Sequence, residues 1–329
     1  MDVLFVGIDI AKASFAAVVR QQGQNGKART FKNTAAGFAQ FFAWLPDVPP
    51  QQLFACLEAT GSYGQALAEA LYARAMPVSV VNPLAVKRFA QAGLVRNQTD
   101  PVDAGILAEF CESKKPRLWQ PPTPAQAELR ALSRRLDDLQ RMLQMERNRL
   151  AANQNQGATL LASLQRLIEQ LQAEIELITA ELRARLDQEA ELKRQKELLM
   201  TIQGVGQLTA MRFLAELGDL RQFADAKQLA AYLGLTPAWK RSGTSVHSRP
   251  RLSKQGPAQV RHLLFMPAIV AKRFNPIVHA FCERLADARK SDMAIIGAAM
   301  HKLVHLMFGV VHTGRPFDPL YLSKQPGPS

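Results

Sequence analysis

The chain has 329 residues, 47% of them hydrophobic, which is enough for two or three folded domains and too apolar for a disordered chain. Lys and Arg outnumber Asp and Glu by 41 to 28, a formal net charge of +13 that favours a nucleic acid over a membrane surface as partner. The cysteines, Cys56, Cys111 and Cys282, show no CxxC spacing, which argues against a zinc site or a disulfide framework. We see no signal-peptide pattern and no apolar run long enough to cross a bilayer, so we expect a cytoplasmic protein with no membrane partner.

The first hundred residues alternate between strand and helix patterns. Short apolar or alternating runs predict strands at residues 3–9, 14–20, 28–32, 53–57 and 77–81, with a turn at 24–27. Helical patterns follow at 35–45, 64–75 and 84–92. Three strands joined by hairpins, followed by strand-helix alternation, predict an α/β domain with a mixed sheet flanked by helices.

Four acidic residues fall at informative places in this domain. Asp9 and Glu58 each end an apolar strand, and neighbouring strands of a mixed sheet bring such ends together. Asp100 and Asp103 open a further helix, where capping is an alternative role: Asp100 as N-cap, Pro101 as first residue, Asp103 on the helix dipole. Converging carboxylates repel one another unless a cation neutralises them. Hard oxygen ligands favour Mg²⁺, with Mn²⁺ as a substitute, and two such ions about 4 Å apart suit attack on phosphorus.

The middle of the chain carries two heptad patterns. Each pattern is a row of leucines and isoleucines on alternating spacings of three and four: Leu129, Leu132, Leu136, Leu139, Leu143 and Leu150, then Leu161, Leu164, Ile168, Leu171, Ile175, Ile178 and Leu182. Glu146 interrupts the first row, and the polar residues 153–157 separate the two. The pattern predicts a coiled-coil hairpin for dimerisation or spacing, with two ordinary amphipathic helices on a core as the alternative.

Gly204 and Gly206 lie between two helical patterns. Glycines one residue apart allow close approach to a phosphate, with free amides at the start of the next helix. We predict a helix-hairpin-helix-like contact with the DNA backbone, and an ordinary helix-helix turn is the alternative.

The basic residues concentrate after this turn. Residues 201–329 hold 17 of the 41 basic and 7 of the 28 acidic side chains, and no Asp or Glu occurs from Ala226 to Cys282. A solvated surface normally mixes signs, so this stretch is predicted to contact phosphates. The expected contacts are Lys240, Arg241, Arg249, Arg251, Lys254 and Arg261, while Lys227, Lys272 and Arg273 add to the charge. His301 and His305 share a helical face, but without an HExxH glutamate we expect them to be core or interface residues.

An ordered set of motifs runs through nearly the whole chain. The N-terminal ones are GIDIAK at 7–12, EATG at 58–61, NP at 82–83 and RNQTDPVDA at 96–104; the C-terminal ones are IQGVG at 202–206, YLGLTP at 232–237, SG at 242–243, SKQG at 253–256 and GRPFD at 314–318. In this order they resemble the bridge-RNA-guided insertion-sequence transposases, relatives of the Piv/MooV site-specific invertases.

The resemblance implies a site and partners. Asp9, Glu58, Asp100 and Asp103 fall where that family has the metal-binding acidic tetrad of a RuvC-like, ribonuclease H-like domain. Ser242 falls where it has a nucleophilic serine, although the residues alone do not separate Ser242 from Ser245, Ser248 or Ser253. It also implies donor and target DNA, a structured noncoding guide RNA, a homodimer that assembles to a tetramer, and action at the bacterial nucleoid.

We therefore predict three regions: a catalytic α/β domain at residues 1–110, a linker and coiled-coil region at 111–198, and a basic, mainly α-helical domain at 199–329. The serine and the acidic tetrad then lie in different domains, so the reaction requires both to reach one phosphate. Three other functions remain open: a metal-only nuclease such as a Holliday-junction resolvase, an actin-like sugar or acetate kinase, and a non-catalytic basic coiled-coil DNA binder. The kinase is disfavoured because Ile10-Ala11-Lys12 follows Asp9 in place of a Gly-Thr or Gly-Ser pair.

Overall fold

A computed structural model of the chain describes residues 3–58, 63–92, 99–155, 157–238, 241–242, 246–247 and 251–320. The chain forms two compact units, residues 1–121 and 122–329. The helix that begins at Asp100 continues to Lys114, beyond the predicted boundary at residue 110, and both long central helices belong to the second unit. Each unit is described by itself.

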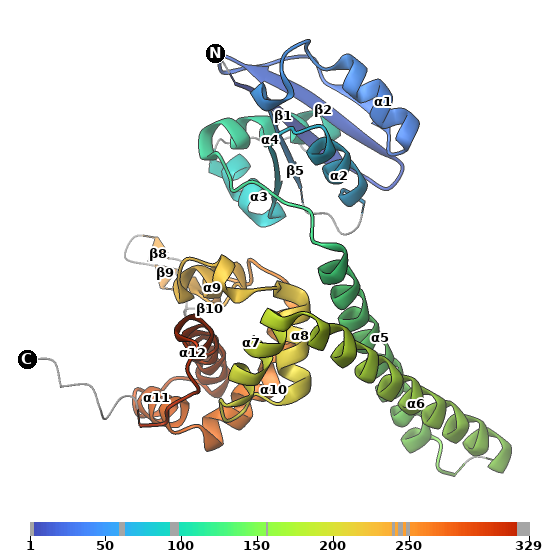
Figure 1. The fold of residues 1–329 in the computed structure, drawn as a ribbon, viewed down its shortest axis with the longest axis vertical. Coiled ribbons are helices and arrows are strands. Elements are labelled where there is room, and N and C mark those ends of the chain that lie inside the picture. The colour runs from blue at the N-terminus through green and yellow to red at the C-terminus, as the bar shows by residue number, and fades with distance from the viewer. Residues whose placement is uncertain are drawn as a thin grey trace, which may run out of the picture. The chain divides into compact units, whose positions relative to one another are not determined.

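The first unit is built on a mixed sheet (Figure 1). Its strands are β1 (Leu4–Ile10), β2 (Ser14–Gln21), β3 (Gln24–Asn25), β4 (Arg29–Lys32), β5 (Leu53–Glu58) and β6 (Val78–Val81), in the order β3-β2-β1-β5-β6 with β4 also paired to β2. β1 and β2 are antiparallel, whereas β1, β5 and β6 are parallel. The predicted mixed sheet is thus confirmed, and β3 is a short addition within the predicted turn.

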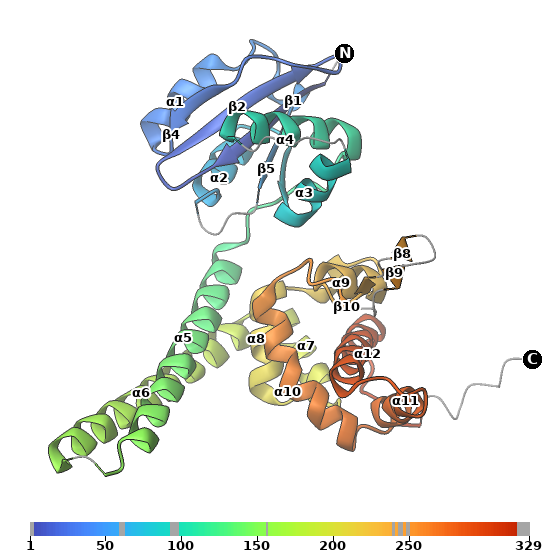
Figure 2. The same ribbon diagram turned by 180° about the vertical axis from the view of Figure 1, so that it is seen from behind.

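Helices cover both faces of this sheet (Figures 1 and 2). On one face, α1 (Ala35–Trp44) and α2 (Gln65–Ala73) enclose a core that includes Val6, Ile8 and Leu57. On the other, α3 (Pro83–Ala92) and α4 (Asp100–Lys114) pack on Phe5 and Cys56. A short 3₁₀ turn, η1 (Pro50–Gln52), leads into β5. Alternation along β1 and β5 sends neighbouring residues to opposite cores.

A close backbone contact in the first unit joins β1 to α4 at Gly7. A Cβ atom there would lie 2.0 Å from the carbonyl oxygen of Ala104 and 2.3 Å from the amide nitrogen of Ala108. Both atoms belong to the helix backbone, so they cannot move aside as a flexible side chain would. The glycine therefore sets how closely α4 approaches the sheet.

Replacing Gly7 with Ala should destabilise the first unit by roughly 1–3 kcal/mol or more, as overpacking in a core does. Gly309, in an α-helix of the second unit, is the matched control because a Cβ atom there meets nothing within 4 Å. Gly309→Ala should be neutral or add up to about 1 kcal/mol, since Ala is the better helix former. Urea unfolding of both variants measures the difference, and equal stabilities would contradict the packing role of Gly7.

Two of the three cysteines prove to be neighbours. All three thiols are buried and free, and Cys111 on α4 forms a hydrogen bond with Cys56 on β5 that, with burial, raises the pKa of the Cys111 thiol. The Cys111 Sγ also lies 3.7 Å from the carbonyl oxygen of Phe54. The contact joins residues 55 positions apart, which spacing motifs cannot reveal.

Two long helices begin the second unit. α5 (Pro124–Ala152) and α6 (Ala158–Gln188) pack along one another as a helical hairpin (Figure 1). Leu129, Leu136 and Leu139 of the first heptad row are buried. Glu146, which breaks that row, is buried too, with Oε1 2.5 Å from Nη1 of Arg149. The predicted pair of long helices is therefore present.

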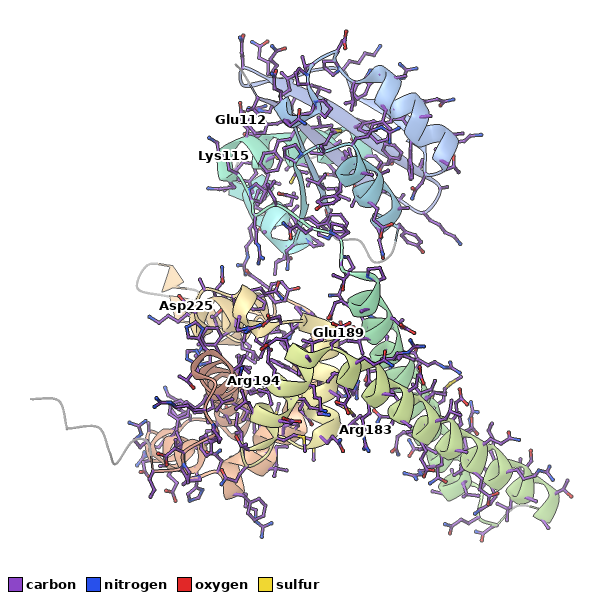
Figure 3. All side chains as sticks on the ribbon, viewed as in Figure 1. Glu112, Lys115, Arg183, Glu189, Arg194 and Asp225 are labelled. Atoms are coloured by element: carbon purple, nitrogen blue, oxygen red, sulfur yellow. The ribbon has the colours of Figure 1, made fainter. Side chains whose placement is uncertain are left out.

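The rest of the second unit is a helical core with a small β-arm. The helices are α7 (Ala190–Met200), α8 (Gln207–Leu217), η2 (Leu220–Gln222), α9 (Ala226–Tyr232), α10 (Ala258–Phe274), α11 (Pro276–Asp287) and α12 (Asp292–Thr313). In Figure 3, Arg183 marks α6, and its Nη2 donates to Oε1 of Gln207 at the start of α8. Of the helices described, α12 is long and apolar enough to cross a membrane, but half of that stretch is buried, as in core helices generally.

Candidate active site

Asp9 and Glu58 stand at the ends of adjacent parallel strands. The last paired residues of β1 and β5 are Ile8 and Leu57, and the two acids follow them directly. Ile8 and Leu57 face the core under α1 and α2, so alternation turns both acids toward the face covered by α4. The predicted meeting of two strand-end carboxylates is thus reproduced in the geometry.

The direction of α4 brings two further acids to this edge. Gly7 contacts Ala104 and Ala108, whereas Cys111 reaches Phe54, which lies toward the beginning of β5. The helix therefore runs antiparallel to β1 and β5, with its first turn at their carboxyl ends. That turn carries Asp100 and Asp103. We call Asp9, Glu58, Asp100 and Asp103 the carboxylate cluster.

The capping role considered for Asp100 is wrong. Thr99 occupies the N-cap position with extended backbone, its side chain makes no capping hydrogen bond, and Asp100 is already the first helical residue. Asp103 is thereby the fourth helical residue. Helix capping therefore does not account for these two acids, although the positive end of the helix dipole still favours negative charge there.

The pKa values of three cluster members show how closely their charges interact. Burial raises the pKa of Asp9, and repulsion from Asp100 and Asp103 raises it further. Burial likewise raises the pKa of Glu58, followed by repulsion from Asp9 and Asp103, and burial followed by Asp100 raises the pKa of Asp103. The protein thus keeps four mutually repelling acids together at a half-buried edge of the sheet.

This chemistry suits a divalent cation. Carboxylate oxygens are the preferred ligands of Mg²⁺ and Mn²⁺, and a cation would remove the repulsion that raises these pKa values. As the side chains are placed, no three Asp, Glu, His or Cys residues within the described ranges stand close enough to hold an ion. The fit therefore rests on the donor set and its electrostatics, and the ligand geometry would form when the ion binds.

Ser242 lies on the β-arm of the second unit, residues 237–252. β7 (Pro237–Ala238) pairs with β10 (Arg251–Leu252), and β8 (Arg241–Ser242) pairs with β9 (Val246–His247) (Figure 1). Ser242 is thus paired with Val246 across β8 and β9. Of the predicted nucleic-acid contacts, Arg241 and Arg251 lie in these strands, and Lys240 and Arg249 lie outside the described residues.

The base of the arm is anchored in the helical core. Leu252 packs over Gly297 of α12, where a Cβ atom would lie 3.3 Å from its Cδ1. Arg261 of α10 donates through Nη1 to the carbonyl oxygens of Leu233, at 3.1 Å, and Gly256, at 2.7 Å, and burial lowers its pKa. These contacts make Arg261 a positioning residue for the arm, in addition to its predicted role toward phosphate.

The other predicted contacts differ in what surrounds them. Lys254 is exposed, with a left-handed backbone (φ 54°). Gly204 has φ 104° and lies against α10, where a Cβ atom would be 2.9 Å from the carbonyl oxygen of Pro267, so packing alone requires a glycine there. Gly206 is exposed, precedes α8 as its N-cap, and has open space around it. Phosphate contact by these residues stays a prediction.

The histidines of α12 also have surroundings of their own. The rings of His301 and His305 lie 4.4 Å apart, and burial followed by nearby cationic groups lowers the pKa of each. The Nε2 atom of His305 is buried without a hydrogen-bond partner. Both residues are thus partly enclosed, in keeping with the core position expected for them.

Two family profiles match the chain. One, described as "Transposase", of the DEDD type named for IS110, matches residues 6–156, which contain all four members of the carboxylate cluster. The other, described as "Transposase IS116/IS110/IS902 family", matches residues 196–283, which contain the β-arm.

Individual relatives agree with these profiles. The chain is 32% identical to the pilin gene-inverting proteins of Moraxella bovis and Moraxella lacunata, over 97% of its own length and 98% of theirs. It is 27% identical to the transposase for insertion sequence element IS1111A of Coxiella burnetii, over 57% of this chain and 58% of that one.

Proposed function

Because the chain belongs to the IS116/IS110/IS902 transposase family, and is thus a DNA-processing enzyme, we propose that it is a divalent-metal-dependent recombinase that moves or inverts a DNA segment. The observation that carries the proposal is the carboxylate cluster, gathered from β1, β5 and α4, in which burial and the repulsion of neighbouring carboxylates raise the pKa values of Asp9, Glu58 and Asp103. Without a cation, the repulsion within such a cluster destabilises the fold, as is common for residues kept for function.

The cluster would hold the metal, which is Mg²⁺ in our proposal, with Mn²⁺ able to replace it. When bound, the ion would stabilise the negative charge that develops on the leaving oxygen of a phosphodiester. The profile of the DEDD type supports dependence on a divalent metal.

Ser242 is the proposed nucleophile. Its Oγ attacks phosphorus and loses its proton, and the displaced deoxyribose oxygen takes up a proton, which leaves the DNA joined to the protein by a phosphoserine bond. A hydroxyl of a second DNA strand then attacks that phosphorus and releases the serine. The basic residues Lys240, Arg241, Arg249, Arg251, Lys254 and Arg261, with the turn at Gly204 and Gly206, bind the DNA or RNA backbone in this proposal.

The finer structural assignments belong to the same proposal. Apart from the two-residue β3, the sheet order is β4-β2-β1-β5-β6. β4, β2 and β1 pair antiparallel, and β1, β5 and β6 pair parallel, which supports a ribonuclease H-like, RuvC-like domain. The two long helices of the second unit support a coiled-coil region through which a homodimer forms and then a tetramer. The three-region division at residues 110 and 198 remains part of this proposal, and the place of action is the bacterial cytoplasm.

A guide RNA would set the DNA sequence that is cut, because base pairing would then supply the specificity that the acid-free basic stretch lacks. We expect the protein purified from its host to carry one discrete structured RNA, transcribed from the flank of its own gene. Sequencing the copurified nucleic acid measures this. Replacing both Arg241 and Arg251 with Gln should reduce the amount of RNA recovered. Recovery of random cellular RNA would contradict guidance by RNA, and the proposal would then be a metal-dependent recombinase without a guide.

A further inference from the structure

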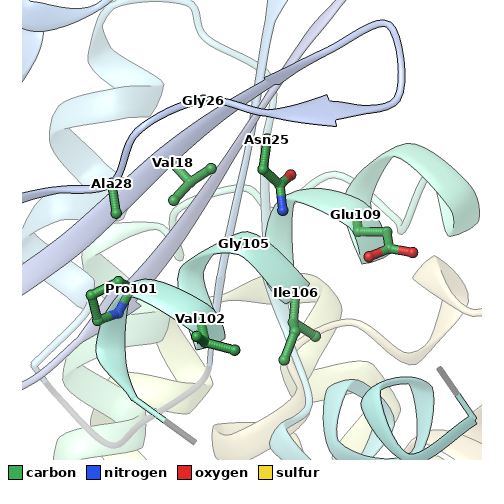
Figure 4. A pocket seen from close by; sticks show the side chains of 9 residues that line it. All are labelled: Val18, Asn25, Gly26, Ala28, Pro101, Val102, Gly105, Ile106 and Glu109. Atoms are coloured by element: carbon green, nitrogen blue, oxygen red, sulfur yellow. The ribbon is translucent and has the colours of Figure 1, made fainter. Parts of the chain in front are cut away.

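A pocket of about 310 Å³ lies beside the first turns of α4 (Figure 4). It is an open pocket between the outer side of that helix and the segment that passes from β2 through β3 toward β4. Pro101 and Val102 line it, and they share the first helical turn with Asp100 and Asp103. The pocket therefore begins at the same turn of α4 as these two acids but on the opposite side of the helix, because successive helical residues are about 100° apart around the axis.

The walls of the pocket are mainly apolar. Val18 and Ala28 come from the strand side, and Val102 and Ile106 from the helix. Asn25 and Glu109 are the members able to hydrogen-bond through their side chains. An amide that donates and a carboxylate that accepts, set among apolar walls, suit a flat ligand whose edge carries both acceptors and donors.

The Asn25 side chain is oriented by its neighbours. Arg20 donates from Nε to Oε2 of Glu112 at 2.6 Å and from Nη1 to Oδ1 of Asn25 at 3.0 Å. This second bond identifies the amide oxygen and leaves Nδ2 as the donor that points toward α4 (Figure 4). Gly105 leaves room for it, since a Cβ atom there would lie 2.9 Å from Nδ2.

We propose that this pocket binds a nucleobase of the DNA strand whose phosphate reaches the carboxylate cluster, an inference that rests on the proposed function. A base turned out of its stack is a flat apolar ring with a polar edge, and enzymes that hold such a base combine apolar contacts with hydrogen bonds to that edge. Asn25 donates to an acceptor of the base, and Glu109 accepts from an N–H group of the base. All four bases carry an acceptor beside an N–H donor, thymine through O4 and N3–H, so the pocket is expected to take a base without strong preference.

The test uses the full chain and the four 2′-deoxynucleosides, which lack a phosphate and are therefore not drawn to the basic stretch. Saturation-transfer NMR in EDTA should show binding of at least one of the four nucleosides. Ala28→Leu fills the pocket and should weaken the best-bound nucleoside about tenfold or more. Ala66→Leu makes the same change at an exposed position of α2 and should leave binding unchanged.

A second variant tests the hydrogen bond without filling the space. Asn25→Asp keeps the acceptor for Arg20 but replaces the Nδ2 donor, and should weaken the best-bound nucleoside about tenfold, within the 1–3 kcal/mol of a base contact. Binding of none of the four nucleosides, or binding that Ala28→Leu and Asn25→Asp leave unchanged, would overturn the proposal. Nucleoside binding requires neither metal nor Ser242. A protein that binds nucleosides in this pocket but cuts no DNA would therefore contradict the proposed function and leave the pocket proposal standing.

Discussion

Replacing Asp9 with Asn should lower the rate of DNA strand cleavage more than roughly 100-fold, because the change removes a charged ligand from the centre of the carboxylate cluster. Loss of a residue that only hydrogen-bonds to a metal ligand lowers metal affinity or activity by about 10–100-fold, and Asp9 is proposed to bind the metal itself. The assay follows cleavage of a DNA substrate by the purified protein in Mg²⁺. Asp47→Asn, the same change at an exposed position of the first unit, is the control and should keep full activity.

The same variant should be more stable than the wild type when no metal is present. Burial and repulsion raise the pKa of Asp9 in the folded state, so its ionised form opposes folding at neutral pH. A carboxyl group whose pKa is higher in the folded than in the unfolded state stabilises the fold at pH values below its unfolded-state pKa. This stabilisation is lost as the pH rises through the folded-state pKa. The advantage of Asn should therefore appear at neutral pH in EDTA, vanish toward pH 4, and reverse in Mg²⁺. An Asp9→Asn protein less stable than the wild type in EDTA would contradict the repulsion.

Replacing Ser242 with Ala should abolish strand cleavage and joining while leaving metal binding and DNA binding nearly intact. The change removes the one oxygen that forms the bond to phosphorus, and the β-arm keeps its anchors at Leu252 and Arg261. Cleavage and joining are read on gels, and affinity by titration with labelled DNA. Ser253→Ala is the control: its hydroxyl accepts from Oγ1 of Thr236 at the base of the arm, and its loss should leave cleavage in place.

The Ser242 variant also separates the proposed recombinase from a metal-only nuclease. If water is the nucleophile, Ser242→Ala protein will still release free DNA ends in Mg²⁺, and Asp9→Asn protein will not. If serine is the nucleophile, neither variant will cut. The two changes thus locate the nucleophile and the metal independently.

Much of the first unit follows from local patterns. Apolar runs of the right length predict β1, β5 and β6, and strand-end acids are recognisable because parallel strands share an edge. The role of Gly7 was not predicted, because its contact with Ala104 and Ala108 joins residues about a hundred positions apart. The contact between the thiols of Cys56 and Cys111 was not predicted, for the same reason.

Local propensity also misled at the start of α4. Asp-Pro is a favourable beginning for a helix, so the residues alone made Asp100 a good N-cap, yet the helix begins one residue earlier than that role requires. Charge patterns were similarly ambiguous for Arg261. An acid-free stretch predicts phosphate contacts, but it does not show which arginine donates to the protein's own carbonyl groups. Both cases depend on tertiary neighbours that a single sequence does not reveal.

The chemical identity of the protein-DNA link tests the proposed serine nucleophile most directly. Wild-type protein should be incubated with its DNA in Mg²⁺, denatured, treated with nuclease and protease, and analysed by mass spectrometry. We predict a nucleotide phosphate on the peptide that contains Ser242, formed only with the metal and absent from the Asp9→Asn protein. Cleaved DNA with no such peptide, or a nucleotide attached to any other residue, would contradict it.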